Sequence, residues 1–219
     1  VEESKPDITQ YRIDLDGREQ KLDTIAALIT HGEYERAIAF CNTKNMTDRL
    51  AGLLKMRGIS CEAIHGDIQQ RIREKTLEKF KRGEIKVLVA TDVAARGIDV
   101  PDITHVVNFD LPKQAEDYVH RIGRTARANN DGVALTFINE KEQSNFKSIE
   151  NFLEKEIYKI PIPEGWERLR NTNRVRFNKN EEREFLIKEK ISGEKETTEG
   201  RKATTLHPDR NKICISLFG

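Results

Sequence analysis

The sequence predicts an α/β fold built on a mostly parallel central sheet flanked by helices. Short apolar segments alternate with helical patterns, which is typical of βαβ crossovers. The run Val87–Ala90 is apolar at every position, as expected of a parallel strand that is buried on both faces. The expected strands are 8–15, 36–41, 59–64, 87–90, 104–109 and 132–138, and the expected helices are 18–30, 44–57, 68–81, 114–122 and 140–153.

Two of the expected helices carry clear boundary signals. Thr43 can accept a hydrogen bond from the first turn of the helix that follows it, and Gly58 can end that helix. The helix at 68–81 is predicted to end before Gly83. Its buried side is expected to carry Ile72, Leu77 and Phe80.

Length and charge indicate one ordinary domain with an appendage. A core of about 150 residues can bury enough apolar surface to fold alone. We expect residues 1–7 to be an inter-domain linker remnant, 8–163 the domain, and 164–219 a charged, partly disordered C-terminal extension. The 38 basic and 37 acidic residues leave a net charge of +1, so a nucleic-acid site must come from local clusters of arginine and lysine.

The cysteines and apolar runs bear on compartment. Cys41, Cys61 and Cys214 form no Cys-x-x-Cys pair, which argues against a disulfide framework or zinc site and fits a reducing cytoplasm, or a nucleus. No apolar run reaches the ~18–20 residues of a membrane helix, and the polar start does not resemble a signal peptide. Since the chain has no initiator methionine, we expect it to begin inside a longer protein.

The segment His120–Arg127 holds three arginines and a histidine within eight residues. Arg124 and Arg127 are three positions apart, so a helical turn would place both guanidinium groups on one face. A guanidinium is always charged and can bind phosphate oxygens in bidentate fashion, and Gly123 lets a ligand approach the backbone. The two arginines are therefore a candidate phosphate clamp, with a solvated basic helix face as the alternative.

A second candidate region follows the strand at 87–90. Ligands of open α/β sheets bind just past the carboxyl ends of the strands. The strand leads into Thr91 and a predicted loop with Arg96, Gly97 and Asp99. We therefore expect these four residues to lie where a nucleotide or nucleic acid binds.

Four short motifs together carry a resemblance to a known family. FCNTK, IHGD with IQQRIR, ATDVAARGID and YVHRIGRTAR occur in the order and spacing of the second RecA-like domain of DEAD-box RNA helicases. The similarity runs from about Ile8 to about Pro163. It implies a three-layer RecA-like domain and an ATP-dependent RNA helicase that unwinds short duplexes locally.

The resemblance also implies roles for individual residues. RNA-backbone contacts, through phosphates and 2′-hydroxyls, are expected from Asn42, Thr43, Gly66, Gln70, Arg73, Thr91 and Arg96. ATP contacts are expected from Gly97, Asp99, Arg124 and Arg127. Arg124 and Arg127 match the catalytic arginine finger that reaches the γ-phosphate. His120 is expected either to relay contacts between the two sites or to be structural.

Several of these residues also have a purely structural interpretation. Asn42 and Thr43 can cap a helix, and His65 can be a satisfied loop histidine. Arg73 can be a solvated surface charge, and Asp99 can cap the turn before the next proline. The residues alone leave both interpretations open.

Ala126 departs from the family pattern, which most often has glycine at this position. A helical alanine here would be harmless. At a positive φ it would be strained by ~1 kcal/mol.

Half of the family's ATPase site is missing from this sequence. It contains no G-x-x-x-x-G-K-[ST] phosphate loop, no Asp-Glu-Ala-Asp motif and no adenine-reading glutamine segment. The resemblance therefore implies that ATP and RNA are shared with an N-terminal RecA-like domain of the same protein, which would hold most of the Mg²⁺ contacts. We expect this fragment to be inactive alone.

Two other functions stay open on the sequence. One is a DNA helicase or translocase domain of the same superfamily, although the Gln70–Arg73 pair and HRIGRTAR favour RNA. The other is a stand-alone, non-catalytic module that binds RNA or protein. Arginines beside Trp166 could add an RNA-binding strip in the extension, or the extension could simply be solvated.

Overall fold

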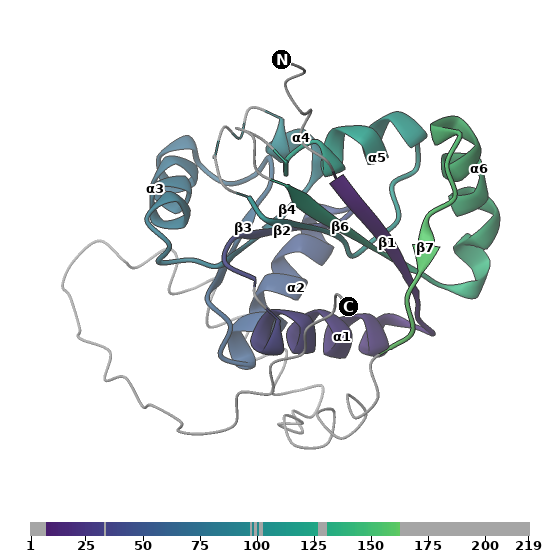
Figure 1. The fold of residues 1–219 in the computed structure, drawn as a ribbon. Helices are drawn as coiled ribbons and strands as arrows, with labels where there is room; N and C mark the ends of the chain where they lie inside the picture. The colour runs from purple at the N-terminus through teal and green to yellow at the C-terminus, as the bar shows by residue number, and fades with distance from the viewer. Residues whose placement is uncertain are drawn as a thin grey trace, which may run out of the picture.

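The backbone is organised around a seven-stranded sheet in which every strand pair is parallel, with the order β3-β4-β2-β5-β6-β1-β7 (Figure 1). The computed structural model describes residues 8–32, 34–96, 98, 100, 103–126 and 131–162. The α/β fold expected from the sequence is confirmed. The predicted linker remnant at 1–7 and the predicted C-terminal extension at 164–219 lie outside the described residues.

The strands are β1 (Ile8–Asp14), β2 (Ala37–Phe40), β3 (Cys61–Ile64), β4 (Val87–Ala90), β5 (His105–Asn108), β6 (Gly132–Ile138) and β7 (Tyr158–Lys159). The helices are α1 (Arg18–His31), α2 (Lys44–Met56), α3 (Gln70–Lys81), α4 (Asp92–Ala95), α5 (Ala115–Ile122) and α6 (Gln143–Leu153), with a 3₁₀ turn, η1 (Glu140–Glu142).

Two layers of helices cover the sheet because successive strand side chains point to opposite faces. In β2, Ala37 and Ala39 pack with residues of α1 and α2. Ile38 and Phe40 face the other way, toward α3 and α4. Further along that second face, α5 and α6 bury Tyr118 and other side chains against β6, so the sheet lies between the two layers (Figure 1).

The predicted start of α2 and the predicted ends of α2 and α3 are confirmed to within one residue, whereas α3 begins at Gln70 rather than at 68. The Thr43 hydroxyl accepts a hydrogen bond from Met46 N at 3.1 Å, which caps α2. Gly58 and Gly83 have φ of 77° and 74° just past the two helices, a left-handed conformation that favours glycine.

Three local predictions were wrong. The stretch after Ala90 is not a loop throughout, because α4 begins at Asp92. Ile72 is 46% exposed, because α3 buries only Thr76 and Phe80 and so contacts the sheet through its second half. β7, which the sequence did not predict, adds an edge strand of two residues.

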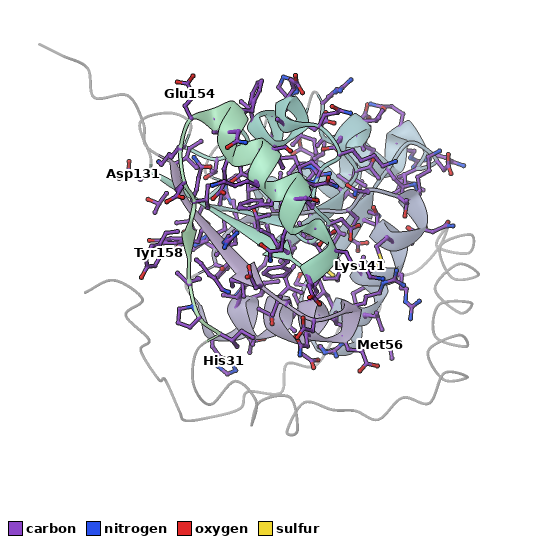
Figure 2. The ribbon with its side chains drawn as sticks, turned by 90° about the vertical axis from the view of Figure 1, so that its right-hand side faces the viewer. His31, Met56, Asp131, Lys141, Glu154 and Tyr158 are labelled. Carbon is purple, nitrogen blue, oxygen red and sulfur yellow. The ribbon has the colours of Figure 1, made fainter. Side chains whose placement is uncertain are left out.

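The outer edge of the sheet lies at β7, beside α6. Tyr158 pairs with Tyr11 in the strand register, and it is 69% exposed at this edge (Figure 2). No helix in the described part of the chain is both long and apolar enough to span a membrane.

Candidate functional site

The sheet register brings the predicted motifs to one edge of the molecule. Ile64, Ala90, Phe40, Asn108 and Thr136 stand in one row across β3, β4, β2, β5 and β6. The chain leaves the first four of these strands within a residue or two of that row. Segments that are distant in sequence therefore meet at the carboxyl edge of the sheet, where α/β proteins bind ligands.

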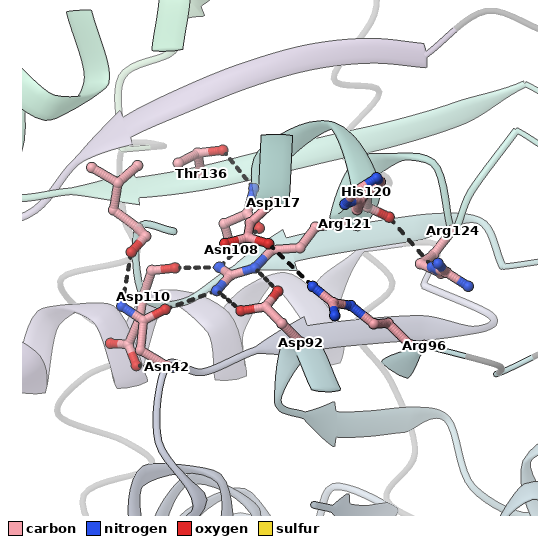
Figure 3. Close-up of polar contacts among 11 residues, drawn as sticks. Asn42, Asp92, Arg96, Asn108, Asp110, Asp117, His120, Arg121, Arg124 and Thr136 are labelled. Atoms are coloured by element: carbon pink, nitrogen blue, oxygen red, sulfur yellow. Dashed lines mark hydrogen bonds and ion pairs between the residues drawn. The ribbon is translucent and has the colours of Figure 1, made fainter. Parts of the chain in front are cut away.

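Arg121 joins these segments from α5 (Figure 3). Its side chain is 1% exposed and forms a bidentate ion pair with Asp92, with Nε–Oδ1 of 2.6 Å and Nη2–Oδ2 of 2.8 Å. It also donates to the Asp110 carbonyl at 2.7 Å and to Asn42 Oδ1 at 2.8 Å. A longer bond of 3.4 Å reaches Asn108 Oδ1. The guanidinium thus connects the ends of β2 and β5 with the start of α4.

A burial this complete needs every donor of a charged group to be satisfied. The five hydrogen bonds of Arg121 use all three guanidinium nitrogens, and the guanidinium carbon lies 5.1 Å from the Phe40 ring centroid. Arg121 was not among the predicted site residues. A usable signal was present, because helical spacing places it on the same buried side as Tyr118 and Ile122.

Asn42 is part of this network. Its side-chain amide donates to the Leu111 carbonyl at 2.8 Å, while its oxygen accepts from Arg121. Its backbone N–H donates to Asp110 Oδ2 at 3.0 Å. The amide is thus committed to protein contacts, although Asn42 and the neighbouring Thr43 are both exposed residues. RNA contacts from Asn42 and Thr43 stay predictions.

The loop after β3 lies beside the start of α2. His65 is 7% exposed, accepts from Asp67 N at 3.4 Å through Nδ1 and lies 2.8 Å from Asp48 through Nε2. The structural interpretation of His65 is therefore confirmed. Gly66 is exposed, and a Cβ there would meet Lys44 at no less than 3.6 Å. An ion pair with Lys44 lowers the pKa of Asp67 below its usual value.

The two predicted residues of α3 differ in their contacts. Gln70 is exposed on the first turn and donates to Glu74 at 2.8 Å. Arg73 donates through Nη2 to the Ala94 carbonyl, so it ties α3 to the end of α4. Arg73 is therefore not simply a solvated charge.

The region after β4 also divides into a buried and an exposed part. Thr91 is 9% exposed and precedes α4, whereas Arg96 is exposed just past it. The guanidinium of Arg96 lies 3.8 Å from Asp117 Oδ1 on α5, with side-chain exposures of 66% and 28%. This is a loose, solvent-exposed ion pair that a bound phosphate could replace.

Arg124 lies just past the end of α5. Its Nε donates to the His120 carbonyl at 3.3 Å, and its Nη1 donates to the Ile98 carbonyl at 3.5 Å. Ile98 stands between Gly97 and Asp99 in sequence, so the two predicted ATP-binding segments meet here. Gly97, Asp99 and Arg127 themselves lie outside the described residues. His120 is exposed, and only its backbone contact to Arg124 bears on the predicted relay.

The expectation that Arg124 and Arg127 share a helical turn was wrong. The helix ends at Ile122, and Ala126 has φ of 54°, in the left-handed region. This resolves the alternative left open for Ala126, because alanine is strained in that conformation by ~1 kcal/mol.

Other chemistry at this edge finds little support. Cys41 precedes Asn42 but is fully buried, and burial raises the pKa of its thiol well above the usual value, so it is not an activated nucleophile. Cys61, at the start of β3, is buried as well. Within the described ranges, no group of three or more His, Cys, Asp or Glu residues could hold a metal ion.

Sequence comparisons place this geometry among known proteins. The model of the helicase conserved C-terminal domain matches residues 20–129. The DEAD-box ATP-dependent RNA helicase CshA of Geobacillus kaustophilus is 42% identical over 174 residues, which cover 80% of this chain and 37% of that protein. The chain therefore spans little more than a third of the length of this relative.

Solved structures give the same result. Escherichia coli DEAD-box protein SrmB, bound to the regulator of ribonuclease activity A, is 36% identical with a TM-score of 0.67, covering 70% of this chain and 90% of that one. Saccharomyces cerevisiae Dbp5, bound to RNA and ADP BeF3, is 33% identical with a TM-score of 0.67, covering 76% of this chain and 44% of that one.

Proposed function

This chain belongs to the helicase conserved C-terminal domain family, as the second RecA-like domain of a DEAD-box RNA helicase, and from that premise we propose that it completes an ATPase site shared with a preceding RecA-like domain. ATP would bind between the two domains. The preceding domain would hold the triphosphate and most contacts to Mg²⁺. This chain would contribute Arg124 and Arg127 as the arginine finger, with Gly97 and Asp99 beside the nucleotide.

The observation that carries this proposal is the contact of Arg124 with the Ile98 carbonyl. It joins the segment after α5 to the segment after α4, so residues expected to touch ATP gather at one place. A guanidinium there can stabilise the negative charge that spreads over the γ-phosphate oxygens in the transition state.

RNA would bind along the carboxyl edge of the sheet. Exposed groups there include Thr43, Gly66, Gln70 and Arg96, and the absence of a side chain at Gly66 allows close approach of a sugar–phosphate backbone. Such contacts read backbone and 2′-hydroxyls rather than bases, which suits recognition of RNA without strict sequence preference. Thr91 and Arg73 would support this surface from beneath.

Closure of the two domains around ATP and RNA would couple the sites. Binding energy that differs between the open and closed arrangements would bend one strand and separate a short duplex, and hydrolysis would reopen the cleft. The yeast relative Dbp5 binds both RNA and ADP BeF3 in its solved complex, which supports a protein that binds the two ligands together. A reducing, cytoplasmic setting stays a prediction from the cysteines.

The test is Arg124→Ala in the two-domain helicase that contains this chain. RNA-stimulated ATP turnover should fall by ~10³–10⁵-fold, because the finger acts mainly in the transition state. ATP affinity, measured with a fluorescent analogue, should change only a few-fold, about the effect of one lost ground-state contact.

Arg82→Ala is the matched control. Arg82 is an exposed arginine at the end of α3 that pairs with Glu84 at 2.7 Å. It lies near the amino ends of the strands, at the opposite edge of the sheet from the proposed site. That variant should keep turnover. Near-normal turnover in Arg124→Ala would overturn the arginine-finger assignment.

A further inference from the structure

The segment that carries Arg124 is anchored on its far side by a buried threonine. Thr125 is 2% exposed, and its hydroxyl donates to the Ile103 carbonyl just before β5. Its backbone N–H donates to the Ile122 carbonyl at 3.1 Å. The residue directly after Arg124 is therefore tied to the segment that leads into β5.

The Thr125 side chain occupies a space that is open only because residue 132 has no side chain; we call this space the seat. A Cβ on Gly132 would lie 2.2 Å from Thr125 Oγ1 and 2.5 Å from Thr125 Cγ2. It would also lie 2.7 Å from the backbone N of Ala126. Real Cβ contacts are not this short, so any larger residue would push the segment 124–126 away from the first residue of β6.

The backbone at Gly132 cannot move aside to make room for a side chain, because its position is fixed by the sheet. It is buried and pairs with Ile8 of β1 at the start of a seven-residue parallel register. The backbone of Ala126 is also constrained, since φ of 54° turns the chain sharply after Thr125. The clash would therefore fall on the arginine segment.

We propose that Thr125 and Gly132 are positioning residues for Arg124. Arg121 holds the segment on one side through Asp92, and Thr125 holds it on the other through Ile103. Arg124 lies between these two anchors, one residue from the second. The Thr125 hydroxyl and the missing side chain at 132 thus set where the Arg124 guanidinium points. This inference rests on the proposed function of Arg124.

Two substitutions at Thr125 separate shape from hydrogen bonding. Thr125→Val keeps the branched shape and removes the hydroxyl, whereas Thr125→Ser keeps the hydroxyl and removes the methyl group. In the two-domain helicase, Thr125→Val should lower kcat for RNA-stimulated ATP hydrolysis by up to about 10²-fold, the scale of a 1 Å misplacement. Its KM for ATP and its RNA affinity should stay within about three-fold, and Thr125→Ser should retain most of the kcat.

Gly132→Ala tests the seat from the other strand. It should lower kcat at least as much as Thr125→Val, because the added methyl group meets both the Thr125 side chain and the Ala126 backbone. Thermal unfolding shows whether the variant is folded. If it is not, the Val and Ser variants at Thr125 decide the question.

A measurement that does not depend on catalysis distinguishes the positioning role of Thr125 from the arginine-finger role of Arg124. In the NMR spectrum of this chain, the Nε–H signal of Arg124, assigned by its loss in Arg124→Lys, should move in Thr125→Val and stay in Thr125→Ser. Unchanged kcat and an unmoved signal in Thr125→Val would overturn the positioning role. If Arg124→Ala keeps its turnover while the signal moves, the arginine-finger assignment fails and the positioning role stands.

Discussion

Arg121 and Arg124 stand one helical turn apart and have opposite environments. Arg121 is 1% exposed, and its guanidinium makes a bidentate ion pair and three further hydrogen bonds. Arg124 lies past the end of the helix, partly exposed, and reaches two backbone carbonyls at 3.3 and 3.5 Å. The two residues have the same chemistry, yet they differ in burial and in the length of these hydrogen bonds.

This difference indicates how the segment combines rigidity with reactivity. A charged group that is buried with all its donors satisfied has one position, and removing it leaves its partners unpaired. A group held by long bonds to neutral acceptors can exchange them for a phosphate at little cost. Arg121 therefore builds the edge of the sheet, whereas Arg124 is partly exposed at that edge and its contact with a ligand stays a prediction.

The largest effect is expected from Arg121→Ala, which tests whether Arg121 stabilises the fold more than Arg124 does. It would leave the Asp92 carboxylate and the Asn42 and Asp110 oxygens without their shared donor, so the free energy of unfolding should fall by about 3–5 kcal/mol. Urea unfolding of this chain, followed by circular dichroism, measures it. Arg124→Ala is the matched control and should change stability by no more than about 0.5 kcal/mol. Equal losses in the two variants would contradict the division of roles.

The free energy of unfolding should also depend on pH, because His105 titrates differently in the folded and unfolded states. Burial lowers the pKa of His105 to about 4, while the unfolded chain titrates near 6.5. Because the unfolded state binds the proton first, stability is full above pH 6.5 and is lost as the pH falls toward 4. Between pH 7 and 5 the loss should be about 2 kcal/mol.

His105→Phe isolates this contribution. The ring stacks on Tyr34 with centroids 3.9 Å apart, and phenylalanine can keep that contact. Urea midpoints of the variant should depend less on pH than those of the parent chain over this window. An identical pH dependence would rule out His105 as the source, and the Arg121 comparison could then be made at any pH in the range.

A smaller effect should come from Ala126→Gly, beside Arg124. Glycine adopts φ of 54° without the strain of a Cβ, so stability should rise by about 1 kcal/mol. Ala51→Gly is the control of opposite sign, since Ala51 lies inside α2, where glycine costs about 1 kcal/mol or more. Urea unfolding measures both, and a loss of stability in Ala126→Gly would show that the left-handed turn is not strained.

Local patterns were enough to predict most of the fold. The six predicted strands and the five predicted helices all form, because each carries its own apolar pattern, and two of the helices also carry end signals at Thr43, Gly58 and Gly83. α4 and β7 were missed because four and two residues are too short for a period to show. Ile72 was misjudged because periodicity gives the side of a helix but not how much of its length is covered.

The site was predictable only where chemistry repeats in short motifs. Those motifs led to Arg124, Thr91 and Gly66, which gather at one edge as expected. Gly132 and Arg121 were missed, because their importance lies in contacts with residues distant in sequence, such as the Cβ clearance to Thr125 and the pair with Asp92. The direct contacts to ATP and RNA stay predictions.

The pairing of β1 with β6 has a consequence for how the chain is made. Ile8 lies beside Gly132, so the first strand has no main partner until the sixth has been synthesised. Closing so long a loop costs entropy before any hydrogen bond is gained. During translation, the segment from Ile8 to Asp14 must therefore wait as an unpaired, partly apolar stretch, and its docking between β6 and β7 should be among the last events of folding.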